Sequence, residues 1–241
     1  MLGTIVNALL IIVGSIIGLL LKGGMKPRYR EIVSNGMGLS VLFIGISMAL
    51  GGMLQDESSP ILYVISIAIG SIIGEKFEIE EKLEGFGDII QNKLSTKESN
   101  VSQGFVTASL TFCVGTMSVL GSIESGTQGV HTILFTKAVL DGIGSIVFAS
   151  TMGIGVVFSA VSVFLYQGSL TMLASYAQEY MTVSVLREIS IVGGIMIFAI
   201  GCNLLEIKKF KVGNMLPAIF IPIIYFLEPI QAIFAKIVSF F

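Results

Sequence analysis

Residues 3–21 read GTIVNALLIIVGSIIGLLL and contain no charged side chain. An α-helix needs about 20 apolar residues to cross the hydrocarbon core of a bilayer, and this segment meets that requirement. Similar apolar stretches recur along the chain, separated by short charged segments. The pattern predicts an all-α, polytopic transmembrane helical bundle whose first span begins near the N-terminus.

Composition favours a single membrane domain over residues 1–241. Hydrophobic residues make up 54% of the chain and charged residues only 12%, whereas about a quarter of an average soluble domain is charged. The net charge is -2, and the basic residues lie in short loops rather than on one face. We therefore expect the lipid bilayer as the surroundings and no nucleic acid as a partner.

Hydropathy in windows of about 19 residues locates the spans. They are predicted at 3–21, 36–54, 60–74, 104–122, 132–149, 153–172, 189–205 and 213–228. The third is short for a span, so we expect seven or eight in total. Residues 1–94 form the first half of the domain and 104–241 the second, joined by a polar linker at 95–103.

Lysine and arginine are concentrated in alternate loops. Loops 22–35, 75–103 and 206–212 hold 11 of the 14 basic residues. Basic loops of membrane proteins tend to remain in the cytoplasm. The distribution predicts a multi-pass protein of the cell membrane, with these three loops in the cytoplasm and the N-terminus outside.

The loop 75–103 contains an amphipathic helix, which we predict at 76–94. Apolar residues recur in it at helical spacing between acidic residues, at Ile79, Leu83, Phe86, Ile90 and Leu94. This helix either packs against the bundle or a partner, or forms a solvated connector at the cytoplasmic surface.

The pentapeptide Gly-Ser-Ile-Ile-Gly occurs twice, from Gly14 to Gly18 and from Gly70 to Gly74. Small residues four positions apart let membrane helices approach closely. We therefore expect these four glycines to pack helices, either within one subunit or between the subunits of a homo-oligomer.

A weaker similarity relates residues 38–50 to residues 194–205, because both begin with two glycines seven positions apart. The predicted topology runs these two segments in opposite directions. An inverted repeat of spans one to three and six to eight would follow, and such repeats are typical of secondary transporters. Chance similarity between glycine-rich apolar segments is the alternative.

The region 113–155 is the polar centre of the chain. Its glycines and hydroxyl side chains favour broken or re-entrant helices, which a membrane tolerates only where protein or water surrounds them. Lys137 and Asp141 are four residues apart and share one helical face. Charges inside a span mark functional sites by default, and a buried structural ion pair is the alternative.

Further candidates for a solute or ion pathway surround this pair, in a site expected between spans four, five and six. They are one carboxylate and six hydroxyl residues: Thr116, Ser118, Ser122, Glu124, Ser145, Ser150 and Thr151. Each hydroxyl can instead bond its own helix, and Glu124 can be solvated at the outer surface.

Enzyme chemistry has little support in the sequence. His131 is the only histidine and lies near the end of a predicted span, and Cys113 and Cys202 lack metal-ligand spacing. Phosphate-loop and dinucleotide motifs are absent from the sequence. We expect neither an enzyme nor a bound metal or cofactor, so any transport is secondary or passive.

Short segments spread over nearly the whole chain carry a family resemblance. They are GTIVN at 3–7, FCVG at 112–115, GSI at 121–123, KAVLDG at 137–142, FASTMGIGV at 148–156, YQG at 166–168 and NMLP at 214–217. With these segments the chain resembles the DUF554 family of bacterial membrane proteins of unknown function. The resemblance implies a membrane protein and supplies no substrate.

Two functions are expected from these observations. The first is a secondary transporter or permeation pathway for a small polar solute or ion, based on the polar centre and the inverted repeat. The alternative is a non-transporting membrane scaffold or assembly factor that holds a partner through the glycine faces and the helix at 76–94.

Overall fold

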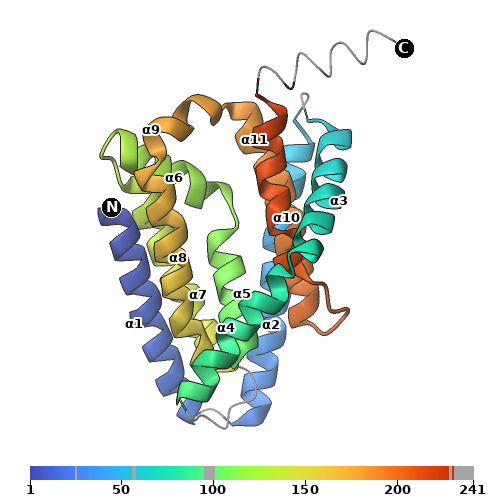
Figure 1. The fold of residues 1–241 in the computed structure, drawn as a ribbon. Helices are drawn as coiled ribbons and strands as arrows, with labels where there is room; N and C mark the ends of the chain where they lie inside the picture. Colours follow the sequence, from blue (N-terminus) through green and yellow to red (C-terminus); the bar gives the residue numbers. More distant parts are fainter. Residues whose placement is uncertain (25, 56–57, 95–100, 228–229, 231–241) are drawn as a thin grey trace.

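The computed structural model describes residues 1–24, 26–55, 58–94, 101–227 and 230, and these form a bundle of helices (Figure 1). In chain order they are α1 (Leu2–Gly24), α2 (Pro27–Met53), α3 (Pro60–Lys76), α4 (Ile79–Leu94), α5 (Val101–Cys113), α6 (Thr116–Thr127), α7 (Thr132–Met152), α8 (Gly155–Met172), α9 (Ala174–Ala177), η1 (Gln178–Tyr180), α10 (Val183–Leu204), η2 (Val212–Phe220) and α11 (Ile221–Tyr225), where η marks a 3-10 helix. Most of the predicted linker at 95–103 lies outside the described residues.

The predicted all-α membrane bundle is confirmed. Five helices, α1, α2, α7, α8 and α10, are long and apolar enough to cross a membrane. Two bent pairs, α3 with α4 and α5 with α6, raise the number to seven when each pair forms one span. The eighth predicted span corresponds to η2 and α11, which form a shorter apolar segment.

Much of the segment from η2 to α11 is a 3-10 helix, which covers a given length with fewer residues than an α-helix. Pro217 lies inside η2, and Pro222 lies in the first turn of α11; proline has no N–H to donate to a preceding carbonyl. A 3-10 helix rises about 2 Å per residue and an α-helix about 1.5 Å, so this segment extends about 25 Å. The 17 residues of α3, which packs beside it, extend about as far.

Broken helices are predicted around 113–155, and the structure has such a break between α5 and α6, whose axes are bent by 60°. α5 ends at Cys113, and Gly115 has a φ of +145°. Side chains other than hydrogen are disfavoured at this φ, so glycine permits the change of direction. Gly153, with a φ of +88°, lies where the chain turns from α7 into α8 rather than inside a span.

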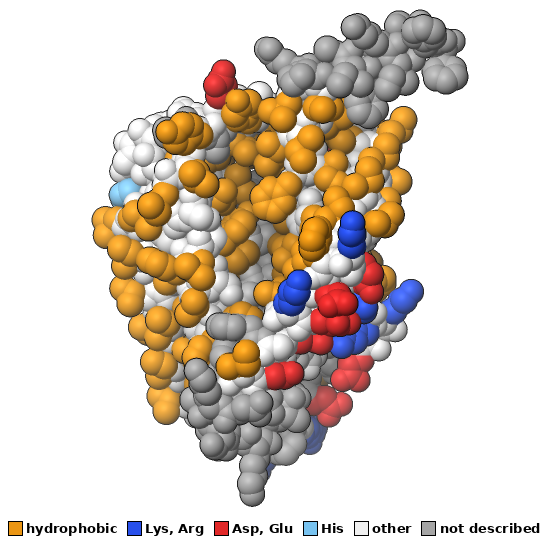
Figure 2. Space-filling view, in the orientation of Figure 1, with side chains coloured by type: hydrophobic (Ala, Val, Ile, Leu, Met, Phe, Trp, Pro, Cys, Tyr) orange, Lys and Arg blue, Asp and Glu red, His pale blue; other side chains and the backbone are white. Residues whose placement is uncertain are grey.

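The charged side chains gather toward one end of the bundle. α1 ends and α2 begins at the lower end in Figure 1, and α4 and α10 descend to the same end. On the face shown in Figure 2, hydrophobic side chains cover the upper part, whereas Lys, Arg, Asp and Glu gather at the lower right. The three basic loops therefore share one end of the protein, and their cytoplasmic location stays a prediction.

α4 packs against the bundle and is not a solvated connector. The carboxylate of Glu80 is buried, and Leu83 contacts the hydrophobic core. The N–H of Gly213 donates to Glu80 Oε2 (2.7 Å), and the N–H of Glu80 donates to Asn214 Oδ1 (2.7 Å). These bonds attach the start of η2 to the start of α4. The side chains of Phe86, Ile90 and Leu94 lie outside the described part of the structure.

The two Gly-Ser-Ile-Ile-Gly segments lie at close contacts between helices of the same chain. A Cβ atom at Gly14 would overlap the carbonyl oxygen of Gly142 on α7, and one at Gly18 would overlap that of Ile146. The later pair lies on α3. There, Gly70 faces the backbone of Ala218 and Gly74 the backbone of Asn214, both in η2. A homo-oligomer through the same glycine faces stays a prediction.

Residues 38–50 of α2 and 194–205 of α10, whose similarity suggests an inverted repeat, pack directly against each other. A Cβ at Gly45 would approach the carbonyl oxygen of Gly194 (2.7 Å), and one at Gly201 would approach Cα of Leu42 (2.7 Å). The contacts run antiparallel along the two helices. Glycines seven positions apart on both partners therefore have a packing function, whether or not a repeat produced them.

Candidate functional site

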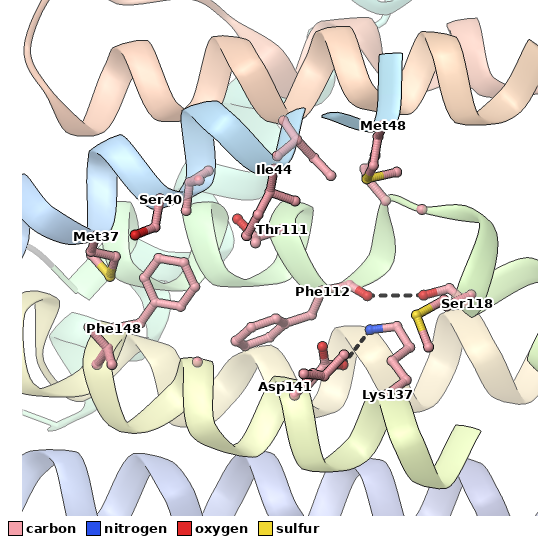
Figure 3. A pocket seen from close by; sticks show the side chains of 18 residues that line it. Met37, Ser40, Ile44, Met48, Thr111, Phe112, Ser118, Lys137, Asp141 and Phe148 are labelled. Carbon is pink, nitrogen blue, oxygen red and sulfur yellow. Dashed lines mark hydrogen bonds and ion pairs between the residues drawn. The ribbon is translucent and has the colours of Figure 1, made fainter. Parts of the chain in front are cut away.

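A cavity of about 640 Å³ lies between α2, α5, the start of α6, α7 and α10 (Figure 3). The largest side chains on its wall are apolar: Met37, Ile44 and Met48 of α2, Phe112 of α5, Met117 of α6, Leu140 and Phe148 of α7, and Ile197 of α10. The cavity lies only partly where the site is expected, between spans four, five and six. α2 and α10 complete the wall in place of α8, because α8 packs against α1, α5 and α6 and contributes no lining residue.

Lys137 and Asp141 lie on the α7 wall of this cavity. Both are buried, with 5% and 7% of their surfaces exposed. The ammonium Nζ of Lys137 donates to Oδ2 of Asp141, one helical turn away. In Figure 3 the pair lies beside Phe112 near one end of the cavity, whereas Met37 and Phe148 lie near the other end. The structure thus places the predicted ion pair near one end of a mainly apolar space.

A second set of polar side chains reaches Asp141 from α1 and α8. Asn7 Nδ2 donates to Asp141 Oδ2 (3.0 Å) and to Gln167 Oε1 (3.2 Å). Asn7 and Gln167 are fully buried. Within the described residues, Asp141 Oδ1 takes no hydrogen bond. Asp141 therefore joins the cavity to a polar contact between two other helices.

The break between α5 and α6 contributes the start of a helix to the cavity. Gly115, Met117 and Ser118 line the cavity at this point. Ser118 Oγ donates to the carbonyl oxygen of Phe112 (3.1 Å), a bond that bridges the break (Figure 3). The first N–H groups of a helix have no partner within that helix and carry partial positive charge. The start of α6 and the Lys137 ammonium thus place positive charge near the same end of the cavity.

Three of the predicted hydroxyl residues bond their own helix and do not line the cavity. Ser145 donates to the carbonyl oxygen of Asp141 (2.7 Å), and Ser150 to that of Val147 (2.8 Å). Thr151 donates to the carbonyl oxygens one turn earlier in the same way. These bonds satisfy the hydroxyl groups locally.

The remaining predicted residues belong to α6. Ser118 lines the cavity, whereas Ser122 is fully buried away from it. Glu124 is half-buried, and its Oε2 has no hydrogen-bond partner in the described structure. The side chain of Thr116 lies outside the described part of the chain.

Sequence reasoning missed Asn7 and Gln167. Each is an amide inside an apolar helix, Asn7 in α1 and Gln167 in α8. A polar amide within a span needs a partner in the bundle, so this signal was available. The apolar wall residues of α2 give no such signal, because one methionine or isoleucine of a membrane helix resembles another.

The comparisons with known proteins identify relatives over nearly the full chain. A family model described as "Protein of unknown function (DUF554)" matches residues 2–227. The "Uncharacterized membrane protein YdfK" of Bacillus subtilis (strain 168) is 41% identical over 222 residues, which cover 92% of this chain and 94% of the relative. The "Uncharacterized protein YqgA" of Escherichia coli (strain K12) is 29% identical over 223 residues, covering 90% and 92%.

No solved structure matches the chain. The name of YdfK and the apolar helices together indicate a multi-pass membrane protein. On the match over residues 2–227, the chain belongs to the DUF554 family of proteins of unknown function.

Proposed function

We propose that this protein is a secondary transporter or permeation pathway that binds a small solute in the cavity at the Lys137–Asp141 pair. The observation that carries the proposal is a cavity of about 640 Å³ that reaches a buried ion pair within a membrane helix. Ligand pockets commonly enclose about 300–1,000 Å³, so a small organic molecule fits this space. A bare ion would leave most of it unfilled.

The walls favour a solute with an apolar body and one anionic group. Most of the large lining side chains are apolar, such as Ile44, Phe112 and Phe148. Ser40 and Thr111 also line the cavity, but their hydroxyls bond carbonyl oxygens of their own helices. The charged groups and the free helix start lie near Lys137 and the start of α6. An anionic group there would contact the ammonium and the first N–H groups of a helix, both of which favour negative charge. This class is narrower than the polar solute or ion expected from the sequence.

The wall between α2 and α7 offers a route into the cavity. Ile44 of α2 and Leu140 of α7 line the cavity and are also 53% and 56% exposed on the surface of the bundle. Both side chains would face lipid in a membrane. An amphipathic solute can therefore approach the cavity from the bilayer as well as from water.

The alternative function as a scaffold has weaker support. A scaffold that only holds a partner needs no open space at its buried charges, whereas the cavity reaches Lys137 and Asp141. In addition, Gly14, Gly18 and the glycines of α3 face helices of this chain. These contacts leave fewer small-residue faces for a partner.

Uptake into proteoliposomes tests the proposal. The probes are radiolabelled aliphatic and aromatic monocarboxylates, with wild type, Lys137→Gln and the matched control Lys82→Gln, whose side chain is exposed on α4. We expect wild type and control to take up one of the probes. Lys137→Gln should reduce uptake about tenfold or more, because a hydrogen bond to a charged group contributes about 1.5–3 kcal/mol.

Two results would contradict the proposal. If Lys137→Gln and Asp141→Asn transport an identified solute like wild type, the site is wrong. If no monocarboxylate is taken up by wild type or raises its thermal stability, the anionic class is wrong.

A further inference from the structure

A second polar region lies next to Asp141, on the side of α1 and α8. It consists of five residues from α1, α6 and α8, which we call the polar cluster: Thr4, Asn7, Ser122, Gln167 and Thr171. Thr171 is 6% exposed and the other four are fully buried. Each has a buried atom without a hydrogen-bond partner: Thr4 Oγ1, Asn7 Oδ1, Ser122 Oγ, Gln167 Nε2 and Thr171 Oγ1.

The Asn7–Gln167 hydrogen bond fixes how α1 and α8 align in the cluster. The two helices pack together and run in opposite directions (Figure 1). Thr4 precedes Asn7 by three residues, and Thr171 follows Gln167 by four. Positions three and four apart lie on the same helix face. Both threonines therefore lie about one turn from the amide pair, toward the N-terminal end of α1.

Ser122 joins the cluster from α6. A Cβ at Gly126, one turn later on the same face of α6, would overlap the carbonyl oxygen of Thr171. α6 thus packs directly against α8 at this level. The three helices that carry these buried hydroxyls and amides pack against one another, and Asn7 connects them to Asp141.

The hydroxyls of the cluster lack a hydrogen bond that many helical hydroxyls of this chain make. They share this with Ser15, Ser66 and Ser71, but they lie on helices that pack around the Asn7–Gln167 amide pair. Serine and threonine in a helix commonly donate to a carbonyl oxygen one turn earlier, as Ser145 and Ser159 do here. Thr4, Ser122 and Thr171 have no such bond. Folded proteins satisfy nearly all buried polar groups, so these groups are arranged for a partner that binds between them.

We propose that the polar cluster binds a small monovalent cation, with Na⁺ as its probe. Four of the five atoms without a hydrogen-bond partner are oxygens, the ligands that hard cations prefer. The fifth, Gln167 Nε2, can donate to one of the hydroxyls. The carboxylate of Asp141, bonded to Asn7, supplies nearby negative charge. In the described ranges no three His, Cys, Asp or Glu side chains group to hold a metal ion, so the ligands within the cluster are neutral and Asp141 supplies the nearby charge.

Charge balance then couples this cation to the solute. Lys137 and Asp141 neutralise each other while the cavity is empty. An anionic solute that takes the Lys137 ammonium leaves the Asp141 carboxylate without its counter-ion in a buried site, which is strongly unfavourable. A cation from the polar cluster restores neutrality at Asp141. The anion and the cation therefore bind together better than either binds alone.

The coupling rests on the proposed function, whereas the cation site does not. The first experiment therefore uses no solute. Purified protein in detergent is titrated with NaCl against choline chloride at constant ionic strength, with binding of radioactive Na⁺ and thermal stability as readouts. The variants are Thr4→Val and Thr171→Val, which remove a hydroxyl and keep the shape. The matched control is Ser15→Ala, which removes a buried, unpartnered hydroxyl elsewhere on α1.

We expect saturable Na⁺ binding and stabilisation by Na⁺ in wild type and in Ser15→Ala. Each threonine variant should weaken Na⁺ binding about tenfold or more while eluting as a single species. Absence of Na⁺ binding in wild type would overturn the site, since water alone would then fill the cluster. Unchanged affinity in both threonine variants would also overturn it.

A second experiment tests the coupling. The uptake assay described above is repeated with Na⁺ gradients and with choline in place of Na⁺. Uptake that depends on Na⁺ in wild type and loses this dependence in Thr171→Val supports the coupling. Na⁺-independent uptake overturns the coupling and leaves the transport proposal standing, whereas Na⁺ binding without any uptake contradicts the transport proposal alone.

Discussion

At the scale of single residues, Asp141 is the position where the two polar regions of the protein meet. Its Oδ2 accepts hydrogen bonds from Lys137 on its own helix and from Asn7 on α1. Two opposite charges that are buried together tolerate an apolar environment far better than one charge alone. The pairing therefore makes both charges tolerable inside the fold while it keeps charge beside the cavity.

This arrangement predicts non-additive effects of substitution. Lys137→Met should lower the free energy of unfolding by about 3–5 kcal/mol, because it leaves a buried carboxylate unpaired. Adding Asp141→Asn should restore most of this loss, since the remaining groups are neutral. Equilibrium unfolding in mixed detergent micelles measures both. Equal stability of the single and double variants would contradict a buried charged pair.

At the scale of elements, glycines decide how closely the helices approach. α1 packs against α7, α2 against α10, and α3 against η2 through glycine contacts with the backbone of the partner. In lipid, helices associate mainly through close packing, because the bilayer is as apolar as their side chains. A single added methyl group at such a contact therefore separates two helices.

Two glycines of α2 provide a matched test. A Cβ at Gly45 would lie 2.7 Å from the carbonyl oxygen of Gly194, whereas one at Gly51 would meet no atom within 4 Å. Gly45→Ala should destabilise the protein by about 1–3 kcal/mol through overpacking. Gly51→Ala should be neutral or stabilise it by up to about 1 kcal/mol, because alanine is the better helix former. Thermal unfolding in detergent compares the two, and equal shifts would argue against close packing of α2 on α10.

At the scale of the whole molecule, charge and hydrophobic surface are separated along the bundle. The three basic loops share one end, and the hydrophobic surface covers the bundle above it (Figure 2). Basic loops of membrane proteins tend to remain in the cytoplasm. We therefore expect this protein to insert in one orientation, with its basic end in the cytoplasm.

Cysteine labelling tests this orientation. Lys208→Cys and Gln128→Cys are introduced separately after Cys113 and Cys202 have been replaced by alanine. A membrane-impermeant thiol reagent added to intact cells should label Gln128→Cys and spare Lys208→Cys until the cells are broken. Labelling of Lys208→Cys in intact cells would reverse the predicted topology.

Several features of the fold follow from local sequence. The spans α1, α7 and α8 agree with their predicted positions to within a few residues, whereas α2 begins nine residues earlier than predicted, at Pro27, and α10 six residues earlier, at Val183. A broken helix was also predicted within 113–155, because glycine and hydroxyl residues weaken a helix wherever it is placed, and the structure has the break at Gly115. Lys137 and Asp141 were placed together, since four residues make one helical turn.

The sequence by itself therefore determined the membrane class, the position of most spans and the ion pair, because each depends on the chemistry of one continuous segment. Only the tertiary structure decided that α2 and α10 close the cavity and that Asn7 and Gln167 meet at Asp141. Those contacts join residues more than 100 positions apart. They depend on which apolar helix faces fit together, and apolar faces differ in shape rather than in any chemistry that the sequence displays.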